Sequence, residues 1–193
     1  MELRDLLIEN RSYRTFDESC EIPHDAILSW IDNCRICPSA RNAQPLRYKI
    51  LDTREGVEKL LPYTAWAGAL PDIKLPPDGG HPSAFVVILC DTTVTKDPRH
   101  AEKDVGIAAM TLLLSATEAG YGGCMIGAFN PDTVGEKLRI PEKYVPMLIV
   151  ALGKPAETVF ITNPKPDGDV TYFRDSHNLH FVPKRLLADI VLE

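Results

Sequence analysis

The amino-acid sequence predicts an α+β fold in which a mixed or antiparallel sheet of about four or five strands lies between helices. Two observations carry this prediction. Residues 84–90, AFVVILC, form a continuous apolar run typical of a strand covered on both faces. Residues 101–119 repeat small and apolar side chains at helical spacing. The chain has 193 residues and no internal repeat or composition break, so we expect residues 1–193 to form a single domain.

The amino-terminal half of the chain contains two amphipathic segments and a strand. Leucines recur at helical spacing in residues 1–9, and the apolar side chains of residues 24–36 share one helical face. Pro38 ends the second helix, because proline cannot continue a helical hydrogen-bond ladder. Residues 47–51, RYKIL, predict a strand that precedes the apolar strand over residues 84–90.

Residues 101–119 form the longest predicted helix. Its apolar stripe is rich in small residues and allows close packing, so we expect this helix to be central and to lie at or near a subunit interface. The stripe comprises Val105, Ala108, Ala109, Leu112 and Ala116.

The carboxyl-terminal half continues with short elements. Residues 124–127, CMIG, predict a strand, and Asn130 is a suitable cap for a helix with Pro131 at its first position. Residues 144–153 predict a second buried strand. Residues 180–193 predict a strand end followed by a short helix.

The composition excludes several classes of function. The net charge is −6, whereas proteins that coat nucleic acid or anionic membranes need a positive surface, so any anionic ligand requires a local basic cluster. The apolar runs are far shorter than the ~20 residues of a membrane-spanning helix. We find no secretory signal, and five cysteines do not suggest a disulfide framework. We therefore expect a reducing, cytoplasmic location.

Three motifs do not predict a site. Cys34 and Cys37 have the spacing of a redox dithiol, but they end a helix, and we expect Cys34 to be buried by helix packing. His177 and His180 lack further ligands at recognisable spacing, so we interpret them as a surface pair and expect no metal. Residues 120–125, GYGGCM, follow a helix and lack the third glycine of a dinucleotide fingerprint.

Two polar segments remain as candidates for ligand binding. Residues 10–16, NRSYRTF, place Arg11, Ser12 and Arg14 at the end of the first helix, where guanidinium and hydroxyl groups are suited to a phosphate. Residues 38–48, PSARNAQPLRY, form a loop between a helix and a strand. Its amide side chains offer both donors and acceptors, as reading the edge of a heteroaromatic ring requires.

Four segments share a pattern in chain order. Residues 11–16, RSYRTF, match Arg-Ser-x-Arg-x-Phe, and residues 38–45, PSARNAQP, match Pro-Ser-x-x-Asn-x-Gln-Pro. Residues 120–129, GYGGCMIGAF, are a glycine-rich segment before an Ile-Gly-Ala-Phe turn, and residues 182–185, VPKR, end in a basic pair. Together these segments resemble the nitroreductase family of flavoproteins. The chain differs from many members at Asn10, where they have a second basic residue.

The resemblance implies a homodimer with FMN bound at the interface and reduced by NADH or NADPH. Hydride would pass through FMN to a nitroaromatic, quinone or similar acceptor by a ping-pong mechanism, and the flavin would do the chemistry, so no catalytic residue is assigned. A flavin or quinone reductase, or a reductive dehalogenase, is an alternative on the same fold. A flavin-binding sensor or storage protein with negligible turnover is another. The proline-rich residues 62–82 would form a lid, and Trp66 would either contact the acceptor or belong to the core.

The resemblance also implies the residues around the flavin. The phosphate, ribityl chain and pyrimidine edge would contact Arg11, Ser12 and Arg14, and the phosphate clamp would be completed by Lys184 and Arg185. The partner subunit would contribute Pro38, Ser39, Ala40, Asn42 and Gln44. Beside the ring, with a backbone N–H directed at the flavin N5, would lie Ile126, Gly127 and Ala128.

Overall fold

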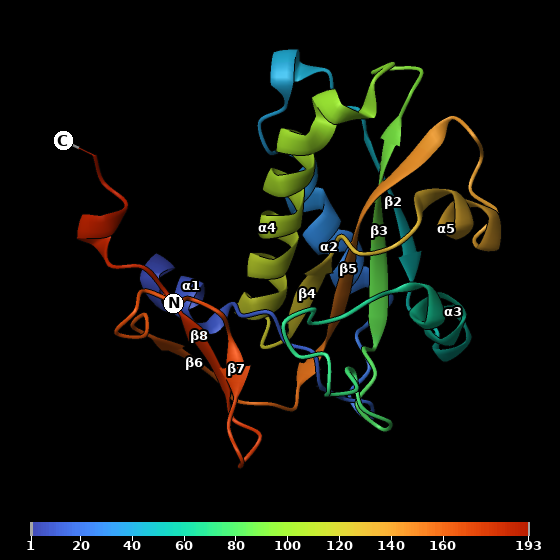
Figure 1. The fold of residues 1–193 in the computed structure, drawn as a ribbon. Coiled ribbons are helices and arrows are strands. Elements are labelled where there is room, and N and C mark those ends of the chain that lie inside the picture. Colours follow the sequence, from blue (N-terminus) through green and yellow to red (C-terminus); the bar gives the residue numbers. More distant parts are fainter. Residues whose placement is uncertain (1, 193) are drawn as a thin grey trace.

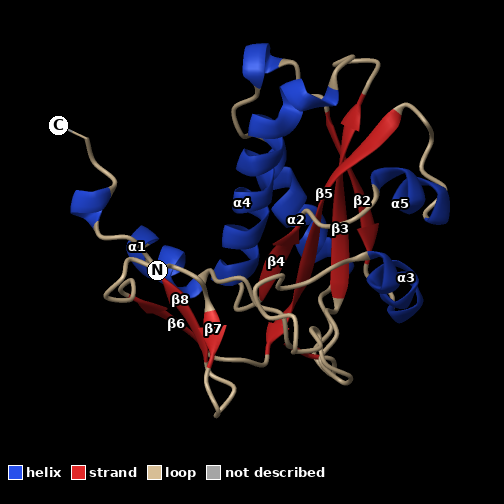
Figure 2. Cartoon of the chain, viewed as in Figure 1, coloured by secondary structure: helices blue, strands red, loops and turns tan. Residues whose placement is uncertain are grey.

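The computed structural model describes residues 2–192 and contains a five-stranded antiparallel sheet (Figures 1 and 2). The order β2-β3-β5 forms its centre, and β4 and the short β1 also pair with β5. The strands are β1 (Phe16–Asp17), β2 (Leu46–Leu51), β3 (Ala84–Asp91), β4 (Gly122–Ile126) and β5 (Tyr144–Pro155). The predicted α+β class and antiparallel sheet are confirmed, and β4 begins two residues before the predicted strand.

Helices cover both faces of this sheet (Figure 1). On one face, α2 and α4 pack against Val86 and Ile88, while on the other α3 and α5 pack near Phe85 and Val87. Every residue of β3 is buried, as its continuous apolar run predicts. The helices are α1 (Leu3–Glu9), α2 (His24–Arg35), α3 (Arg54–Leu60), α4 (Glu102–Glu118) and α5 (Pro131–Lys137).

The apolar stripe of α4 packs inside the chain. Its residues are at most 7% exposed and contact α2 and the central sheet. The prediction of a central helix is therefore correct, and the stripe itself is covered by its own chain. That this helix lies near a subunit interface stays a prediction. On the exposed side of α4 lie Gly106 and Ile107, with the half-buried Met110 beside them.

A second, three-stranded sheet was not predicted. It consists of β6 (Val159–Thr162), β7 (Phe173–Arg174) and β8 (His180–Pro183), with β8 central, parallel to β6 and antiparallel to β7. Figures 1 and 2 show this sheet near α1, with the last residues of the chain extending away from it. A short 3₁₀ helix (Leu187–Asp189) follows β8, as expected for the end of the chain.

Local signals in the sequence agree with the structure at two further places. Asn130 caps α5, since its Oδ1 accepts a hydrogen bond of 2.9 Å from the backbone N–H of Thr133. Cys34 is buried, and its thiol is within hydrogen-bond distance of the carbonyls of Trp30 and Ala108, to which it donates. Burial raises the pKa of Cys34 to about 12, so this thiol is not activated for redox chemistry.

Residues 62–82 run over the surface without a strand or α-helix. The segment is tied to the body by backbone hydrogen bonds, including one of 3.0 Å from Ala65 N to Ala128 O. Trp66 packs against the core beside Phe85, with ring centroids 6.5 Å apart, and its Nε1–H donates to Thr64. Of the two roles open to Trp66, the structure therefore favours the core. None of the helices within residues 2–192 is long and apolar enough to cross a membrane.

Candidate cofactor-binding site

A pocket of about 370 Å³ lies between the segment after α1, the middle of α4 and the carboxyl-terminal sheet. Its volume is in the range of small-molecule sites, roughly 300–1,000 Å³. Four of the predicted flavin-binding residues line it together, and no acidic side chain of residues 2–192 does. The lining residues are Asn10, Arg11, Ser12, Arg14, Met110, Leu113, Met125, Tyr172, His180, Val182 and Lys184.

The first wall of this pocket is held by a close approach of two backbones. Ser12 forms a parallel bridge with Gly123 of β4, and the N–H of Tyr13 donates to the carbonyl of Gly123 at 3.0 Å. A Cβ atom at position 123 would lie 2.1 Å from the carbonyl oxygen of Ala151, so only glycine fits there. The glycine-rich segment of β4 therefore sets the position of the backbone that carries Arg11 and Arg14.

Arg14 is buried, with 9% of its surface exposed. Its Nη1 donates to the carbonyl of Ser12 at 3.2 Å, and its guanidinium lies over the ring of Tyr172, 5.0 Å from the centroid. Arg11 donates from Nη2 to the carbonyl of Leu7 at 2.5 Å. Within residues 2–192, no carboxylate forms an ion pair with Arg11, Arg14 or Lys184. The positive charge of the pocket is therefore free to bind an anion.

Among residues 2–192, three buried nitrogen atoms in side chains that line the pocket have no hydrogen-bond partner: Nε of Arg11, Nε of Arg14 and Nε2 of His180. Buried polar groups in proteins are almost always hydrogen-bonded, so a cluster of unpaired ones needs an explanation. All three belong to side chains that line one cationic pocket. A fully ionised phosphate, whose oxygens can only accept hydrogen bonds, is the kind of group that would satisfy these three nitrogen atoms.

His180 corrects a prediction. We expected a surface pair with His177, but His180 is 1% exposed, and only His177 is on the surface. The Nε–H of Arg174 donates to Nδ1 of His180 at 3.2 Å, and the ring stacks on Tyr172 with centroids 5.5 Å apart. Burial, followed by the charges of Arg14 and Arg174, lowers the pKa of His180 to about 4. The imidazole is therefore neutral at physiological pH.

Of the predicted loop of residues 38–44, Pro38, Ser39 and Gln44 line a different pocket of about 390 Å³, whereas Ala40 and Asn42 do not line it. Asp104 of α4 holds this loop, because its carboxylate accepts from the hydroxyl of Ser39 at 2.5 Å and from the N–H of Ala40 at 3.2 Å. No local sequence pattern indicated this anchor. The lining residues are Cys34, Arg35, Cys37, Pro38, Ser39, Gln44, Leu46, Arg47, Tyr48, Asp104 and Ala108.

The backbone of this loop is strained. Arg41, Asn42 and Gln44 have φ values of 55°, 52° and 52°, a region that costs energy for residues other than glycine. The amide of Gln44 donates from Nε2 to Oδ1 of Asn42 at 3.1 Å, so two predicted site residues are paired with each other. Strained backbone of this kind is concentrated at functional sites, which supports a binding role for the loop.

The two pockets lie on different faces of α4. Met110 and Leu113 line the first pocket, whereas Asp104 and Ala108 line the second. At about 100° per residue, these two pairs point in nearly opposite directions from the helix axis. The described chain therefore brings together Arg11, Ser12, Arg14 and Lys184 but keeps the loop of residues 38–44 apart from them.

The remaining predicted residues lie outside both pockets. Ile126 is 3% exposed and packs into the core, and Met125 enters the first pocket in its place. Gly127 is exposed, and Ala128 lines a separate hollow. Arg185 is exposed and does not line the first pocket, unlike its neighbour Lys184.

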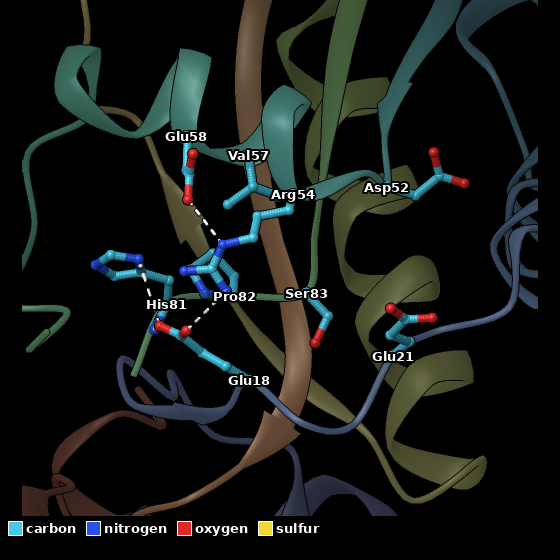
Figure 3. A pocket seen from close by; sticks show the side chains of 9 residues that line it. All are labelled: Glu18, Glu21, Asp52, Arg54, Val57, Glu58, His81, Pro82 and Ser83. Carbon is cyan, nitrogen blue, oxygen red and sulfur yellow. Dashed lines mark hydrogen bonds and ion pairs between the residues drawn. The ribbon is translucent and has the colours of Figure 1, made fainter. Parts of the chain in front are cut away.

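Another hollow lies near the start of α3 and is rich in carboxylates (Figure 3). Glu18 and Glu58 both pair with Arg54, and Glu18 also lies 3.4 Å from Nδ1 of His81. The volume of this hollow is about 100 Å³, below the size of a small-molecule site. No group of side chains within residues 2–192 is arranged to hold a metal ion. The cationic pocket remains the better candidate.

An antiparallel sheet covered by helices defines an α+β protein, and the pocket beside α4 carries the positive charge that attracts an anion. The model of the nitroreductase family matches residues 7–76 and 79–154. The chain belongs to the nitroreductase family of oxidoreductases.

Relatives and solved structures agree with this assignment. A Methanothermobacter thermautotrophicus protein, provisionally named NADH dehydrogenase/NAD(P)H nitroreductase, is 26% identical over 81% of this chain and 79% of its own length. YdgI of Bacillus subtilis, provisionally named an NAD(P)H nitroreductase, is 25% identical over 81% of this chain and 90% of its own. A provisionally named nitroreductase from Exiguobacterium sibiricum, solved in complex with FMN, has the same fold. Its TM-score is 0.69 at 18% identity, with 90% of this chain and 98% of that chain covered.

Proposed function

We propose that this chain is an FMN-dependent oxidoreductase that passes hydride from NADH or NADPH to a nitroaromatic, quinone or similar acceptor. The observation that carries the proposal is the cationic pocket with three unpartnered buried nitrogen atoms. The provisional names of two relatives include NAD(P)H, and one neighbour of the same fold is a complex with FMN.

The residues of the pocket fit the phosphate end of FMN. Arg11, Arg14 and Lys184 would neutralise the phosphate, and charge-assisted hydrogen bonds of this kind contribute about 1.5–3 kcal/mol each. Ser12 would add a hydroxyl, and Arg185 lies next in the chain to Lys184. Bound FMN would supply two-electron transfer between the nicotinamide and the acceptor.

The placement of the second pocket supports a homodimer. A flavin held by the cationic pocket would need the loop of residues 38–44 from another chain, because the two lie on different faces of α4. Two-fold symmetry would then create two equivalent sites. The end of the chain offers additional apolar surface for a second copy. Its exposed side chains are Leu186, Leu187, Ile190, Val191 and Leu192.

The cofactor is tested on the purified protein. We expect a flavin absorption spectrum and release of FMN, not FAD or riboflavin, on denaturation. Lys184→Ala should weaken FMN binding in a fluorescence titration of the flavin-free protein, whereas Lys59→Ala, an exposed lysine of α3, should not. A protein that ignores added FMN would contradict the proposal. Steady-state oxidation of NADH or NADPH with a quinone or nitroaromatic present distinguishes an enzyme from a flavin-storage protein.

A further inference from the structure

His180 places an unpartnered hydrogen-bond donor in the wall of the cationic pocket. The ring is neutral and its Nδ1 accepts from Arg174, so the single ring proton is on Nε2. Nε2 is buried and has no partner within residues 2–192, and His180 lines the pocket. Alternate residues of β8 point to one face, so His180, Val182 and the following Lys184 all line the pocket.

We infer that His180 is a ligand-contacting residue whose Nε2–H donates a hydrogen bond to a phosphate oxygen of bound FMN. This inference rests on the proposed function and adds to it a binding residue that family resemblance did not indicate. The charged side chains that line the pocket, Arg11, Arg14 and Lys184, are all cationic. An anionic oxygen is therefore the acceptor that this pocket is suited to bring to Nε2.

A neutral donor has a physical advantage at this position. An imidazolium ring would add a charge next to the guanidinium groups of Arg14 and Arg174, where like charges repel. The neutral ring contributes a directed N–H without that repulsion. Its direction is fixed, because Arg174 holds Nδ1 from one side and the ring stacks on Tyr172.

Glu157 connects His180 to the opposite wall of the pocket. Its side chain is 4% exposed and pairs with Nη2 of Arg174, which in turn binds His180. The same carboxylate accepts the backbone N–H groups of Arg14 and Thr15, the latter at 3.0 Å. We assign Arg174 and Glu157 as positioning residues, since they orient the donors of both walls without lining the pocket themselves.

Two substitutions of His180 separate a hydrogen bond to ligand from a structural role. Asparagine is short: its Oδ1 can accept from Arg174 in place of Nδ1, but no donor reaches the pocket. Glutamine places its amide N–H near the position of Nε2. We expect His180→Asn to weaken FMN binding about 10-fold or more, and His180→Gln to stay within about 3-fold of the parent chain. Riboflavin, which lacks the phosphate, should bind both variants as it binds the parent.

The outcomes distinguish the two levels of the argument. If the parent chain does not bind FMN, the proposed function fails, and the inference fails with it. If the parent binds FMN and His180→Asn binds it equally well, the inference alone is wrong. Equal losses for FMN and riboflavin would also overturn it, because the contact would not be to phosphate.

A spectroscopic measurement on the parent chain does not depend on variants that fold. In ¹⁵N NMR, His180 should show the Nε2-protonated neutral tautomer between pH 6 and 8. Added FMN should shift the Nε2 resonance and produce a coupling to the ³¹P nucleus of the phosphate. An Nδ1-protonated ring, or an Nε2 resonance that FMN does not move, would overturn the assignment.

Discussion

The imidazole of His180 and the guanidinium groups of Arg14 and Arg174 share one buried region. Such a cluster is stable only if the imidazole stays uncharged, because burial and both cations disfavour its protonation. The difference between the folded and unfolded proton affinities of His180 makes the stability of the chain depend on pH.

We predict that the free energy of unfolding falls as the pH is lowered from about 6.5 to about 4. Unfolded His180 binds a proton near its ordinary pKa of 6.5, whereas the folded pKa is about 4, so acid favours the unfolded chain across this interval. The stabilisation is complete above pH 6.5 and lost below pH 4. Urea unfolding of the flavin-free protein at several pH values measures it. His180→Gln should show a flatter profile in the same interval, and identical profiles would contradict the prediction.

Single residues were predictable where neighbours in sequence are also neighbours in the pocket. Arg11, Ser12 and Arg14 lie within four positions, so their placement around one pocket was visible in the sequence. His180 reaches the pocket only through a sheet formed by distant segments, and no local pattern indicated its burial. One signal was available: alternate positions from Lys184 lead back along β8 to Val182 and His180.

At the element scale, the contact between β4 and β5 depends on a glycine. Gly123 is buried, and its Cα faces the carbonyl of Ala151 and the side chain of Leu113 too closely for any Cβ atom. By contrast, a Cβ at Gly135 in α5 would meet no atom of the described residues within 4 Å, apart from its chain neighbours and the backbone of its own helix.

We predict opposite effects for alanine at these two glycines. Gly123→Ala should lower the free energy of unfolding by about 3 kcal/mol or more, because backbone must move to admit the methyl group. Gly135→Ala should raise it by about 0.5–1 kcal/mol, since alanine favours the helix and meets no obstacle. Denaturant titration of both variants tests the pair. Similar small effects would mean that β4 and β5 are not as close as described.

The loop of residues 38–44 depends on α4 in the same way. Asp104 is 5% exposed and accepts two hydrogen bonds from the loop. These bonds oppose the strain of three residues at positive φ.

Asp104→Ala should therefore lower the free energy of unfolding by about 1–3 kcal/mol, because the donors of Ser39 and Ala40 lose their acceptor. It should also weaken FMN binding, since the loop would no longer be held in place. Glu102→Ala, an exposed acid in the same first turn of α4, is the matched control and should change neither quantity appreciably. A similar result for both variants would show that the acid acts only through the helix terminus.

Elements were predictable when their own sequence determined them. The continuous apolar run of β3, the periodicity of α4 and the Asn130 cap of α5 were all visible locally. The sheet of β6, β7 and β8 was not predicted, because its strands are only two to four residues long and gain stability from one another. That omission is why Tyr172, His180 and Val182 were missing from the predicted site, although Lys184 was included.

For the whole molecule, the two halves of the proposed flavin site are separated by the thickness of α4. Met110 and Leu113 line the cationic pocket, whereas Asp104 and Ala108 line the second pocket, beside the loop of residues 38–44. Between them on the helix surface lies Ile107, which is exposed. If a second copy packs along this surface, each cationic pocket can face the loop of the other chain.

This arrangement predicts that two differently damaged chains restore one site when they associate. Arg11→Ala with Lys184→Ala removes charge from the cationic pocket, and Asn42→Ala with Gln44→Ala alters the loop. Each variant alone should bind FMN poorly at both sites of its homodimer. In a heterodimer, one site inherits both defects and the other inherits none, so FMN binding should return to about half of the parental level.

The heterodimer is prepared by unfolding the two variants together, refolding them and separating the mixed species by affinity tags. If both halves of a site came from one chain, every site in the heterodimer would keep one defect, and FMN binding would stay low. Each variant refolded alone is the control for recovery of folded protein. Light scattering provides an independent check, since a parental chain that remains monomeric with FMN bound would exclude a site shared between subunits. If FMN binding recovers in the heterodimer but in neither variant refolded alone, each site must be built from two chains.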